Sequence, residues 1–303
     1  MSRTEQPADG WRVATDESFD LAEGPVWDPL RERLMWVDIR RGTVLVGELR
    51  DDGTISIVDR VQTAGMVGAV AVSREGDWIV AGERGILTRS VSGVLSNGPT
   101  ILPPDSGRRL NDAKVDPAGR FVVGTLKIDE SPTVTEQLIV VQPDGRLDEL
   151  DADLTLSNGL AWSPDGSVLY SIDTVPRVLY ARDYDAATGT AGPRRTLIAF
   201  DDGVFPDGMC VDADGQLWVA IWGGGQVRRY TPYGVLTRTI EVPAPHTSCV
   251  AFAGADLSTM VITTARKDLD DDQLAASPLS GRLFTLDAGV RGLPATWWSG
   301  NPR

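Results

Sequence analysis

The sequence contains few of the residues that support the commonest catalytic and metal-binding chemistries. Its 303 residues include one histidine, His246, two cysteines, Cys210 and Cys249, and three lysines. One histidine excludes a zinc site built on several histidines of one chain, and two cysteines exclude a four-cysteine zinc site or a disulfide framework. A Ser-His-Asp hydrolase is not expected either, because the G-x-S-x-G motif is missing. We expect Cys210 and Cys249 to be buried thiols.

Long apolar runs, basic clusters and helical periodicity are missing as well. No stretch of 18 apolar residues exists, so no membrane-spanning helix is expected. The formal net charge is -14 and no basic stripe is visible, which argues against a nucleic-acid partner. The first ten residues lack the apolar segment of a signal peptide, and a cytoplasmic protein is predicted. No long segment has the 3.6-residue period of a helix, which favours an all-β fold.

The chain does contain a repeated phrase, and this is its most informative feature. An apolar residue lies four places after the start of each copy, and successive copies of this anchor are 45, 43, 47, 49 and 41 residues apart. Each copy reads as a short apolar strand, an X-Gly turn and a second strand, with further strands after it. The copies start at Glu23, Gly68, Asn111, Asn158, Asp207 and Ser248.

Repeats of this length with about four strands each are typical of propeller blades. We therefore predict an all-β fold, a six-bladed β-propeller, with residues 1–303 forming one domain. Residues 11–13 and 297–298 are expected to complete the last blade, and the acidic run 268–272 is expected to be a solvated loop. The tryptophans are expected to pack within the blades. A pair of β-sandwiches is the alternative architecture.

The residue that starts each copy is unusually polar for the first position of a strand. Equivalent positions in a propeller lie at equivalent heights around the axis, so these side chains should converge at one mouth of the channel. Carboxylate and amide oxygens suit a hard cation such as calcium, magnesium or manganese, and zinc also accepts oxygen ligands. The alternative is that these residues only cap turns and strand ends.

The sequence also resembles the SMP-30/gluconolactonase/luciferin-regenerating-like family from about Leu21 to Leu286. The phrases that carry the resemblance include EGPVWDP, RLNDAKVDPAGRFVVGT, SNGLAWSPDGSVLYSIDT and FPDGMCVDADGQLWVAIW. The family fold is a six-bladed propeller. The chain departs from the family pattern at Ala113 and over Lys127–Glu136, a segment near the family's substrate pocket.

The resemblance implies a set of site residues. By motif match, one divalent cation would be held by Glu23, Asn158 and Asp207. Asn111 would assist at the site, and Arg109 would bind the substrate. The three implied metal ligands coincide with positions that the repeat analysis had already selected.

The resemblance implies hydrolysis of a sugar-acid lactone, with a small-molecule sugar lactone as substrate. The metal would polarise the carbonyl and an activated water would attack it. Asp207 is the candidate general base, with Asp112 and Asp173 as alternatives that could equally be structural. Two other functions remain open, namely hydrolysis of another ester-like electrophile, such as a phosphotriester or a different lactone, and a non-enzymatic metal-binding scaffold.

Overall fold

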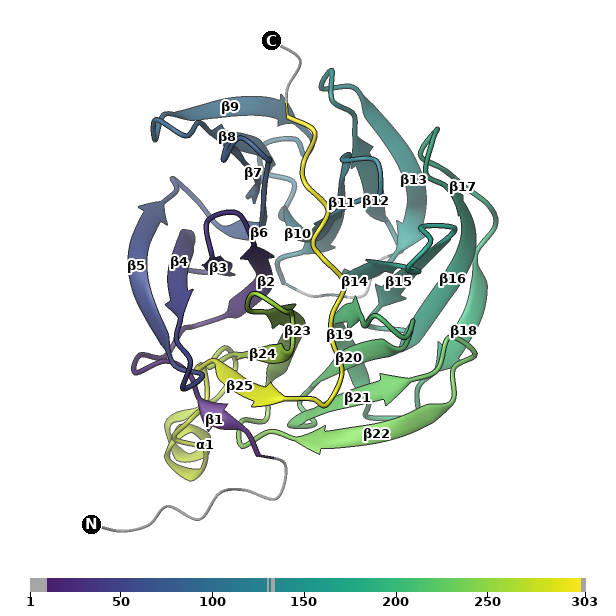
Figure 1. Cartoon of the computed structure of the whole chain (residues 1–303). Helices are drawn as coiled ribbons and strands as arrows, with labels where there is room; N and C mark the ends of the chain where they lie inside the picture. The colour runs from purple at the N-terminus through teal and green to yellow at the C-terminus, as the bar shows by residue number, and fades with distance from the viewer. Residues whose placement is uncertain (1–9, 130, 132–133, 301–303) are drawn as a thin grey trace, which may run out of the picture.

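Six small antiparallel sheets surround a central axis in the computed structural model (Figure 1). The structure describes residues 10–129, 131 and 134–300, so the other residues of the predicted 1–303 domain lie outside the described part. The described residues form twenty-five strands and one short helix. The predicted all-β, six-bladed propeller is confirmed.

The first three blades follow one another along the chain, and each runs from an innermost to an outermost strand. Blade 1 contains β2 (Ala22–Asp28), β3 (Arg33–Asp38), β4 (Thr43–Leu49) and β5 (Ile55–Gln62). Blade 2 contains β6 (Val67–Val72), β7 (Trp78–Gly82), β8 (Gly85–Arg89) and β9 (Leu95–Thr100). Blade 3 contains β10 (Arg108–Val115), β11 (Phe121–Lys127), β12 (Glu136–Val141) and β13 (Leu147–Leu154).

The last three blades repeat this arrangement with small variations at their outer edges. Blade 4 contains β14 (Ser157–Trp162), β15 (Val168–Asp173), β16 (Val178–Asp185), β17 (Thr190–Ala191) and β18 (Arg195–Ala199). Blade 5 contains β19 (Phe205–Val211), β20 (Leu217–Trp222), β21 (Gln226–Tyr230) and β22 (Leu236–Glu241). Blade 6 contains β23 (Thr247–Ala253), β24 (Thr259–Thr264), β25 (Phe284–Asp287) and β1 (Arg12–Val13).

The repeated phrase corresponds to the first hairpin of each blade. Its anchor residues are all buried, at 3–7% exposure, between neighbouring sheets. The X-Gly turns join the first two strands, and their glycines have positive φ, for example 103° at Gly76 and 91° at Gly119. The buried anchors are Trp27, Val72, Val115, Trp162, Val211 and Phe252.

Every innermost strand has a break in register close to its start. The pairing shifts between Glu23 and Val26 on β2 and between Asn158 and Leu160 on β14, and similar shifts occur on β6, β10, β19 and β23. A β-bulge bends a strand and turns a side chain in a new direction. The six bulges occur at or beside the six repeat starts, which places these positions at one end of the channel.

Both chain ends contribute to the ring, but in different ways. β1 pairs with β25, and the Trp11 ring packs edge-on against Phe284 at 5.5 Å, so the first strand completes the last blade as predicted. The prediction for residues 297–298 is wrong, because Trp298 forms a parallel bridge to Ser73, just beyond β6. The C-terminal segment instead crosses one face of the ring (Figure 1).

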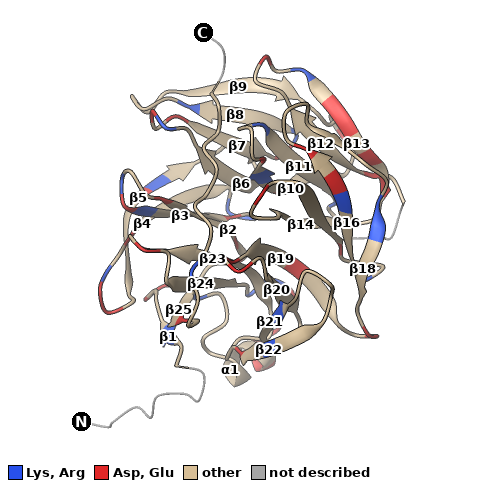
Figure 2. Ribbon diagram, turned by 45° about the vertical axis from the view of Figure 1, so that its right-hand side comes forward, with Lys and Arg blue, Asp and Glu red and all other residues tan. Residues whose placement is uncertain are grey.

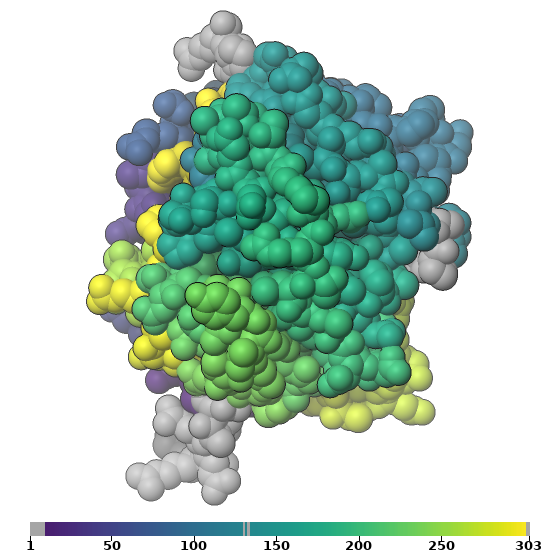
Figure 3. All heavy atoms as spheres, turned by 90° about the vertical axis from the view of Figure 1, so that its right-hand side faces the viewer, coloured from purple at the N-terminus to yellow at the C-terminus, as the bar shows by residue number. Residues whose placement is uncertain are grey.

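This segment, residues 290–299, is here called the strap. Gly292 bridges to Asp212 after β19, and the Ser299 amide donates to the Gly119 carbonyl at 2.9 Å. These contacts lie beyond the far ends of the innermost strands, opposite the bulges. In the edge-on view the strap (yellow) lies on one face, and the residues around α1 (yellow-green) lie toward the other (Figure 3).

The acidic run 268–272 was expected to be a solvated loop, but its last residues are helical. Its last residues begin α1 (Asp271–Ala276), and the Asp270 carboxylate accepts from the Gln273 amide at 2.8 Å. The Gln273 side chain accepts from the Asp270 amide in return, which forms a capping box. No helix in the described part of the chain is long and apolar enough to cross a membrane.

Charged side chains join blade 3 to blade 4 near the rim. Acidic residues lie along β13, and basic residues lie on β16 and β18 or just before them (Figure 2). Asp151 of β13 pairs with Arg182 of β16 although both side chains are buried, and Arg194 reaches Asp151 at 3.4 Å. Because a buried charge without its partner is costly, these pairs specify how the two blades meet.

The close packing of the innermost strands leads to a prediction at Gly68. A Cβ atom there would lie 2.3 Å from the Asn111 carbonyl oxygen and 2.9 Å from that of Leu110, both in the backbone of the next blade. We expect Gly68→Ala to lower the unfolding free energy by about 1–3 kcal/mol. Gly192→Ala is the matched control, because its nearest contact would be an ordinary 3.7 Å. Equal effects of the two substitutions in denaturant unfolding would contradict this account of the packing.

Candidate functional site

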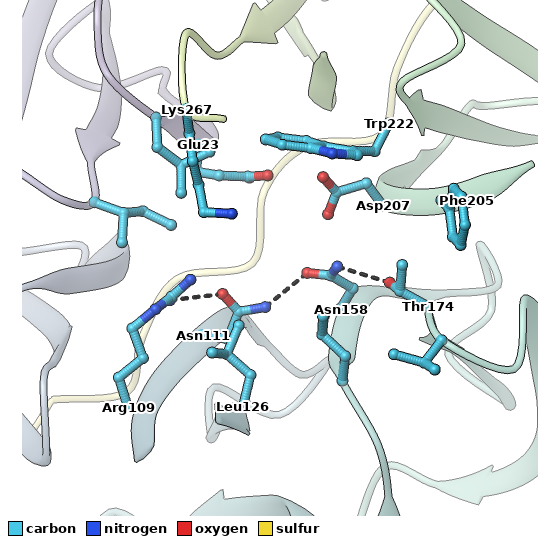
Figure 4. Close-up of a pocket in the computed structure, with 14 residues that line it drawn as sticks. Glu23, Arg109, Asn111, Leu126, Asn158, Thr174, Phe205, Asp207, Trp222 and Lys267 are labelled. Atoms are coloured by element: carbon cyan, nitrogen blue, oxygen red, sulfur yellow. Dashed lines mark hydrogen bonds between the residues drawn. The ribbon is translucent and has the colours of Figure 1, made fainter. Parts of the chain in front are cut away.

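A pocket of about 270 Å³ opens at the bulged end of the channel. All five site residues predicted from the sequence line it, and Figure 4 shows their side chains converging. The volume lies near the lower limit of ligand pockets, which suits a ligand about the size of one sugar ring. The predicted residues in its wall are Glu23, Arg109, Asn111, Asn158 and Asp207.

These side chains come from four different blades. Glu23 lies on β2, Arg109 and Asn111 on β10, Asn158 on β14 and Asp207 on β19. The bulges described above begin at or beside the residues on β2, β14 and β19, and the β10 bulge spans Asn111. The sequence therefore builds the site from one repeated local feature.

A chain of hydrogen bonds orients the two amide side chains. Arg109 Nη1 donates to Asn111 Oδ1 at 2.7 Å, and Asn111 Nδ2 donates to Asn158 Oδ1 at 2.7 Å. Asn158 Nδ2 donates to Thr174 Oγ1 at 2.8 Å, and this hydroxyl donates to the Pro206 carbonyl at 2.8 Å. With its nitrogen held by Thr174, Asn158 presents its oxygen to the pocket, and an amide oxygen has a second lone pair available.

The two pocket carboxylates are buried in an environment that disfavours their charge. Burial raises the pKa of Glu23 to about 8, with a further increase from the Asp112 charge and opposition from the Gly24 amide. Burial also raises the pKa of Asp207 well above its usual range, and the Glu23 and Asp112 charges add to this. The charges of Lys267 and Arg109 oppose the increase at Asp207. Such a carboxylate pair is suited to a bound cation.

The other two candidate bases lie outside this pocket. Asp112 lines a separate cavity toward the strap, and Asp173 accepts hydrogen bonds from the Thr155 and Leu156 amides. The contacts of Asp173 fit the structural role that was one of its two alternatives. Among the pocket-lining residues, the carboxylates are Glu23 and Asp207.

Two of the six repeat starts do not contribute to the pocket wall. Ser248 was counted among the converging polar groups, but its hydroxyl donates to the Ala22 carbonyl at 2.6 Å and is fully buried. Gly68 has no side chain and lies against the backbone of Asn111. Four positions, those on blades 1, 3, 4 and 5, therefore form the polar set.

Several pocket residues were not predicted. Thr174, Phe205, Trp222 and Lys267 line the wall, and Trp222 is an exception to the expectation that the tryptophans pack within blades. His246 does not line the pocket but stacks on the Trp222 ring at 4.2 Å. Lys267 lies in the loop after β24, outside the repeated phrase, so the repeat pattern did not indicate it.

The donor set fits a divalent cation on chemical grounds. Across residues 10–129, 131 and 134–300, no group of three or more His, Cys, Asp and Glu side chains could hold a metal, so a site here depends on the Asn158 amide oxygen. Two buried carboxylates and one fixed amide oxygen form an all-oxygen set, which hard cations prefer. The residues that could hold such an ion are Glu23, Asn158 and Asp207.

The sequence and the fold are both similar to those of known proteins. Regucalcin of Xenopus laevis is 34% identical over 295 residues, which cover 94% of this chain and 96% of the relative. A crystal structure of the calcium-binding protein regucalcin from Agrobacterium tumefaciens has a TM-score of 0.88 at 30% identity and covers 95% of this chain and 96% of its own. A luciferin-regenerating enzyme has a TM-score of 0.83 at 28% identity, with 92% and 95% covered.

A family model described as the SMP-30/gluconolactonase/LRE-like region matches residues 21–266. This range includes all five predicted site residues, and it extends from the start of blade 1 to the loop that follows β24. The chain belongs to the SMP-30/gluconolactonase/LRE-like family.

Proposed function

We propose that this protein is a divalent-metal-dependent lactonase that opens a sugar-acid lactone to the free acid. The observation that carries the proposal is the convergence of Glu23, Asn158, Asp207 and Arg109 in one small pocket. Membership of a family that includes gluconolactonases supports the reaction class. The calcium-binding relative supports a divalent cation, for which calcium, magnesium, manganese and zinc are the candidates.

The proposed metal ligands are Glu23, Asn158 and Asp207. When bound, a divalent cation would polarise the lactone carbonyl, offset the negative charge that develops on its oxygen and favour ionisation of the two carboxyl groups. The protein contributes the fixed direction of the Asn158 oxygen, because Asn111 and Thr174 hold both ends of that amide.

Asp207 is proposed as the general base. It removes a proton from the attacking water as the water oxygen bonds to the carbonyl carbon. The ring carbon–oxygen bond then breaks, and the proton passes from Asp207 to the departing ring oxygen, which leaves as a hydroxyl. Glu23 is the other carboxylate in the pocket wall, and its proposed role is to bind the cation.

Arg109 and Asn111 are proposed to position the substrate. Arg109 is buried, with 6% of the residue exposed, and its Nη1 also donates to the Leu110 carbonyl at 3.0 Å, which helps to fix the guanidinium. A planar guanidinium offers several donors in a fixed geometry, so it can bind sugar hydroxyls. Holding the substrate in place lowers the entropic cost of reaching the reactive geometry.

The first prediction of this proposal concerns metal dependence and the two carboxylates. We expect aldonolactone hydrolysis, followed with a pH indicator, to stop on chelation and to return with one of the four cations. Asp207→Asn and Glu23→Gln should each lower kcat/KM by about 10²-fold or more, because a positioned base alone contributes about 10²–10⁴-fold. Asp144→Asn is the control, since Asp144 is exposed in the turn between β12 and β13 and does not line the pocket, so this variant should retain most of the activity.

The same assay distinguishes the competing functions. Turnover of a phosphotriester or another ester, but of no aldonolactone, would move the proposal to a different electrophile at the same residues. Metal binding without turnover of any substrate would indicate a metal-binding scaffold. Full activity after chelation, or in Asp207→Asn, would contradict the mechanism.

The second prediction concerns Thr174, which holds the amide of Asn158 through hydrogen bonds on both sides. Thr174→Val keeps the shape but removes the acceptor for Asn158 Nδ2, so the amide oxygen is no longer fixed. We expect affinity for the cation, measured by calorimetry, to fall about 10–100-fold, as for other groups that orient metal ligands. Thr100→Val on exposed β9 should leave the affinity unchanged, and equal affinities in all three proteins would refute the role of Thr174.

The third prediction concerns the pH dependence of stability in chelator. An unfolded chain ionises Glu23 near its ordinary pKa of 4.5, whereas the folded protein retains the proton up to about 8. The folded state is therefore favoured below 4.5, and that contribution is lost as the pH rises from 4.5 through about 8. We expect the Tm of the chelated protein to fall across this interval, and to fall less steeply in Glu23→Gln. Equal slopes for the two proteins would contradict the burial of an uncompensated carboxylate.

A further inference from the structure

An aromatic wall lies beside the carboxylate that is proposed as the general base. Phe205, at the start of β19, and Trp222, at the end of β20, are directly opposite each other in the antiparallel pairing of these strands. Asp207 follows Phe205 by two residues on the same strand, and all three residues line the pocket. Figure 4 shows the indole next to the Asp207 carboxylate, with the phenyl ring on the side away from Glu23. One hairpin of blade 5 therefore supplies both the base and an aromatic surface beside it.

The Trp222 ring is held from behind by the single histidine of the chain. The His246 ring stacks on it, with the ring centres 4.2 Å apart and an angle of 11° between the planes, so it covers one flat side of the indole. His246 Nδ1 lies 2.8 Å from the Lys267 carbonyl oxygen, which holds the imidazole in turn. His246 does not line the pocket, whereas Trp222 does. In Figure 4 the indole is seen nearly edge-on above Asp207, so its other flat side is turned toward the pocket.

The pocket wall is divided equally between apolar and polar side chains. Trp222 is partly exposed, although it packs against a core cluster formed mainly by blades 1 and 2. Seven of the fourteen lining residues are apolar, with Leu126, Leu156 and Val175 among them, so a well-fitting ligand needs an apolar face as well as polar groups. Apolar surface in contact with water is unfavourable, and a ligand that covers it gains free energy.

A closed sugar-lactone ring has both kinds of surface. Its hydroxyl groups project around the edge of the ring, while a flat side presents C–H groups. The hydrogens of these groups are slightly positive because each carbon also bears an electronegative oxygen. The face of an indole is slightly negative because of its π electrons, so the two surfaces attract each other. A ring stacked on Trp222 leaves its hydroxyl-bearing edge for the polar half of the wall.

Opening of the ring removes this surface. The product acid is a flexible chain, and several carbon–carbon bonds would have to be fixed before it could present a flat row of C–H groups. Fixing rotatable bonds costs conformational entropy, which subtracts from the affinity. A flat aromatic surface held at a fixed angle therefore binds the cyclic form of a sugar acid better than the open-chain form.

We propose that Trp222 is a substrate-binding residue whose indole stacks on a C–H face of the closed lactone ring and so distinguishes the cyclic substrate from its open-chain product. Phe205 extends the same wall to the rim of the pocket, where 38% of the residue is exposed. This inference rests on the proposed lactonase function and adds ring closure to the features that the site recognises. Trp222 takes no part in the chemical step.

The test compares a cyclic and an open-chain ligand, both of them neutral amides. D-glucono-1,5-lactam is a closed ring with nitrogen in place of the ring oxygen, and D-gluconamide is an open-chain amide with a similar row of hydroxyl groups. Calorimetry with calcium present should show that the wild type binds the lactam about tenfold or more tightly than the gluconamide. Equal affinities would overturn the proposal, and they would do so whether or not the protein hydrolyses lactones.

Substitution of Trp222 should change this affinity ratio. Trp222→Leu should lower the ratio about fivefold or more, whereas Trp222→Phe retains an aromatic face and should retain most of it, which a role in core packing alone would not predict. Trp297→Leu is the matched control, because Trp297 is also partly buried and packs against the same core cluster but lies in the strap and does not line the pocket. A ratio that is unchanged in Trp222→Leu, or equally lowered in Trp297→Leu, would overturn the proposal.

A measurement on the wild type keeps the test independent of how well the variants fold. Protons that lie above the face of an aromatic ring resonate upfield, so the ring C–H protons of the lactam should move upfield in proton NMR spectra when it binds. The absence of this shift in bound lactam would overturn the stacking even if aldonolactones are turned over. Ring-selective binding that depends on Trp222 would support it even if no lactone is hydrolysed, so the two proposals fail separately.

Discussion

The closeness of the six innermost strands around one axis is the constraint on which the site depends. At Gly159 a Cβ atom would lie 2.6 Å from the Asp207 carbonyl oxygen, and at Gly68 it would lie 2.3 Å from that of Asn111. The innermost strands also bulge close to their starts, and on four of them the bulge lies at or beside a polar residue that lines the mouth of the channel. One local irregularity, repeated around the ring, thus brings four polar side chains together.

The same packing buries two carboxyl groups in an environment that disfavours their ionised form, and this makes the pocket suited to a cation. Glu23 and Asp207 are buried close to the axis, and repulsion between them and from the Asp112 charge adds to the cost of desolvating these two carboxylates. A cation at the mouth would remove most of that cost and would place a positive charge beside the substrate carbonyl. In this account the feature that destabilises the metal-free protein is also the source of its proposed catalytic power.

Most of the fold could be predicted because its information is local and repeated. Repeat length, X-Gly turns and buried anchors are visible in the sequence, and they correspond to strands, turns and inter-blade contacts in the structure. Residues 297–298 were wrongly assigned to the last blade because they lie in the strap, which occurs once and has no repeat pattern to guide a prediction. The acidic run hid a helix because the Asp270 capping box spans only a few residues.

The residues of the candidate site that lie at repeat starts could be predicted from the sequence. Those that lie outside the repeated positions could not, because only the arrangement of neighbouring blades brings them to the pocket. Glu23, Asn111, Asn158 and Asp207 occupy equivalent positions, so their convergence follows from the symmetry of the blades. Thr174, Trp222 and Lys267 lie at the ends of other strands or in loops, and they reach the pocket only because neighbouring blades place them there. Ser248 shares the repeat position but forms a hydrogen bond to blade 1 instead, which sequence position alone does not reveal.

The central claim is that side chains from three blades form one site for a divalent cation. A crystal structure of the protein grown with manganese, with anomalous difference data collected near the manganese absorption edge, tests it most directly. The account predicts one strong peak within coordination distance of the carboxylates of Glu23 and Asp207 and the Asn158 Oδ1 atom. A peak elsewhere, or no peak at a saturating manganese concentration, would contradict it.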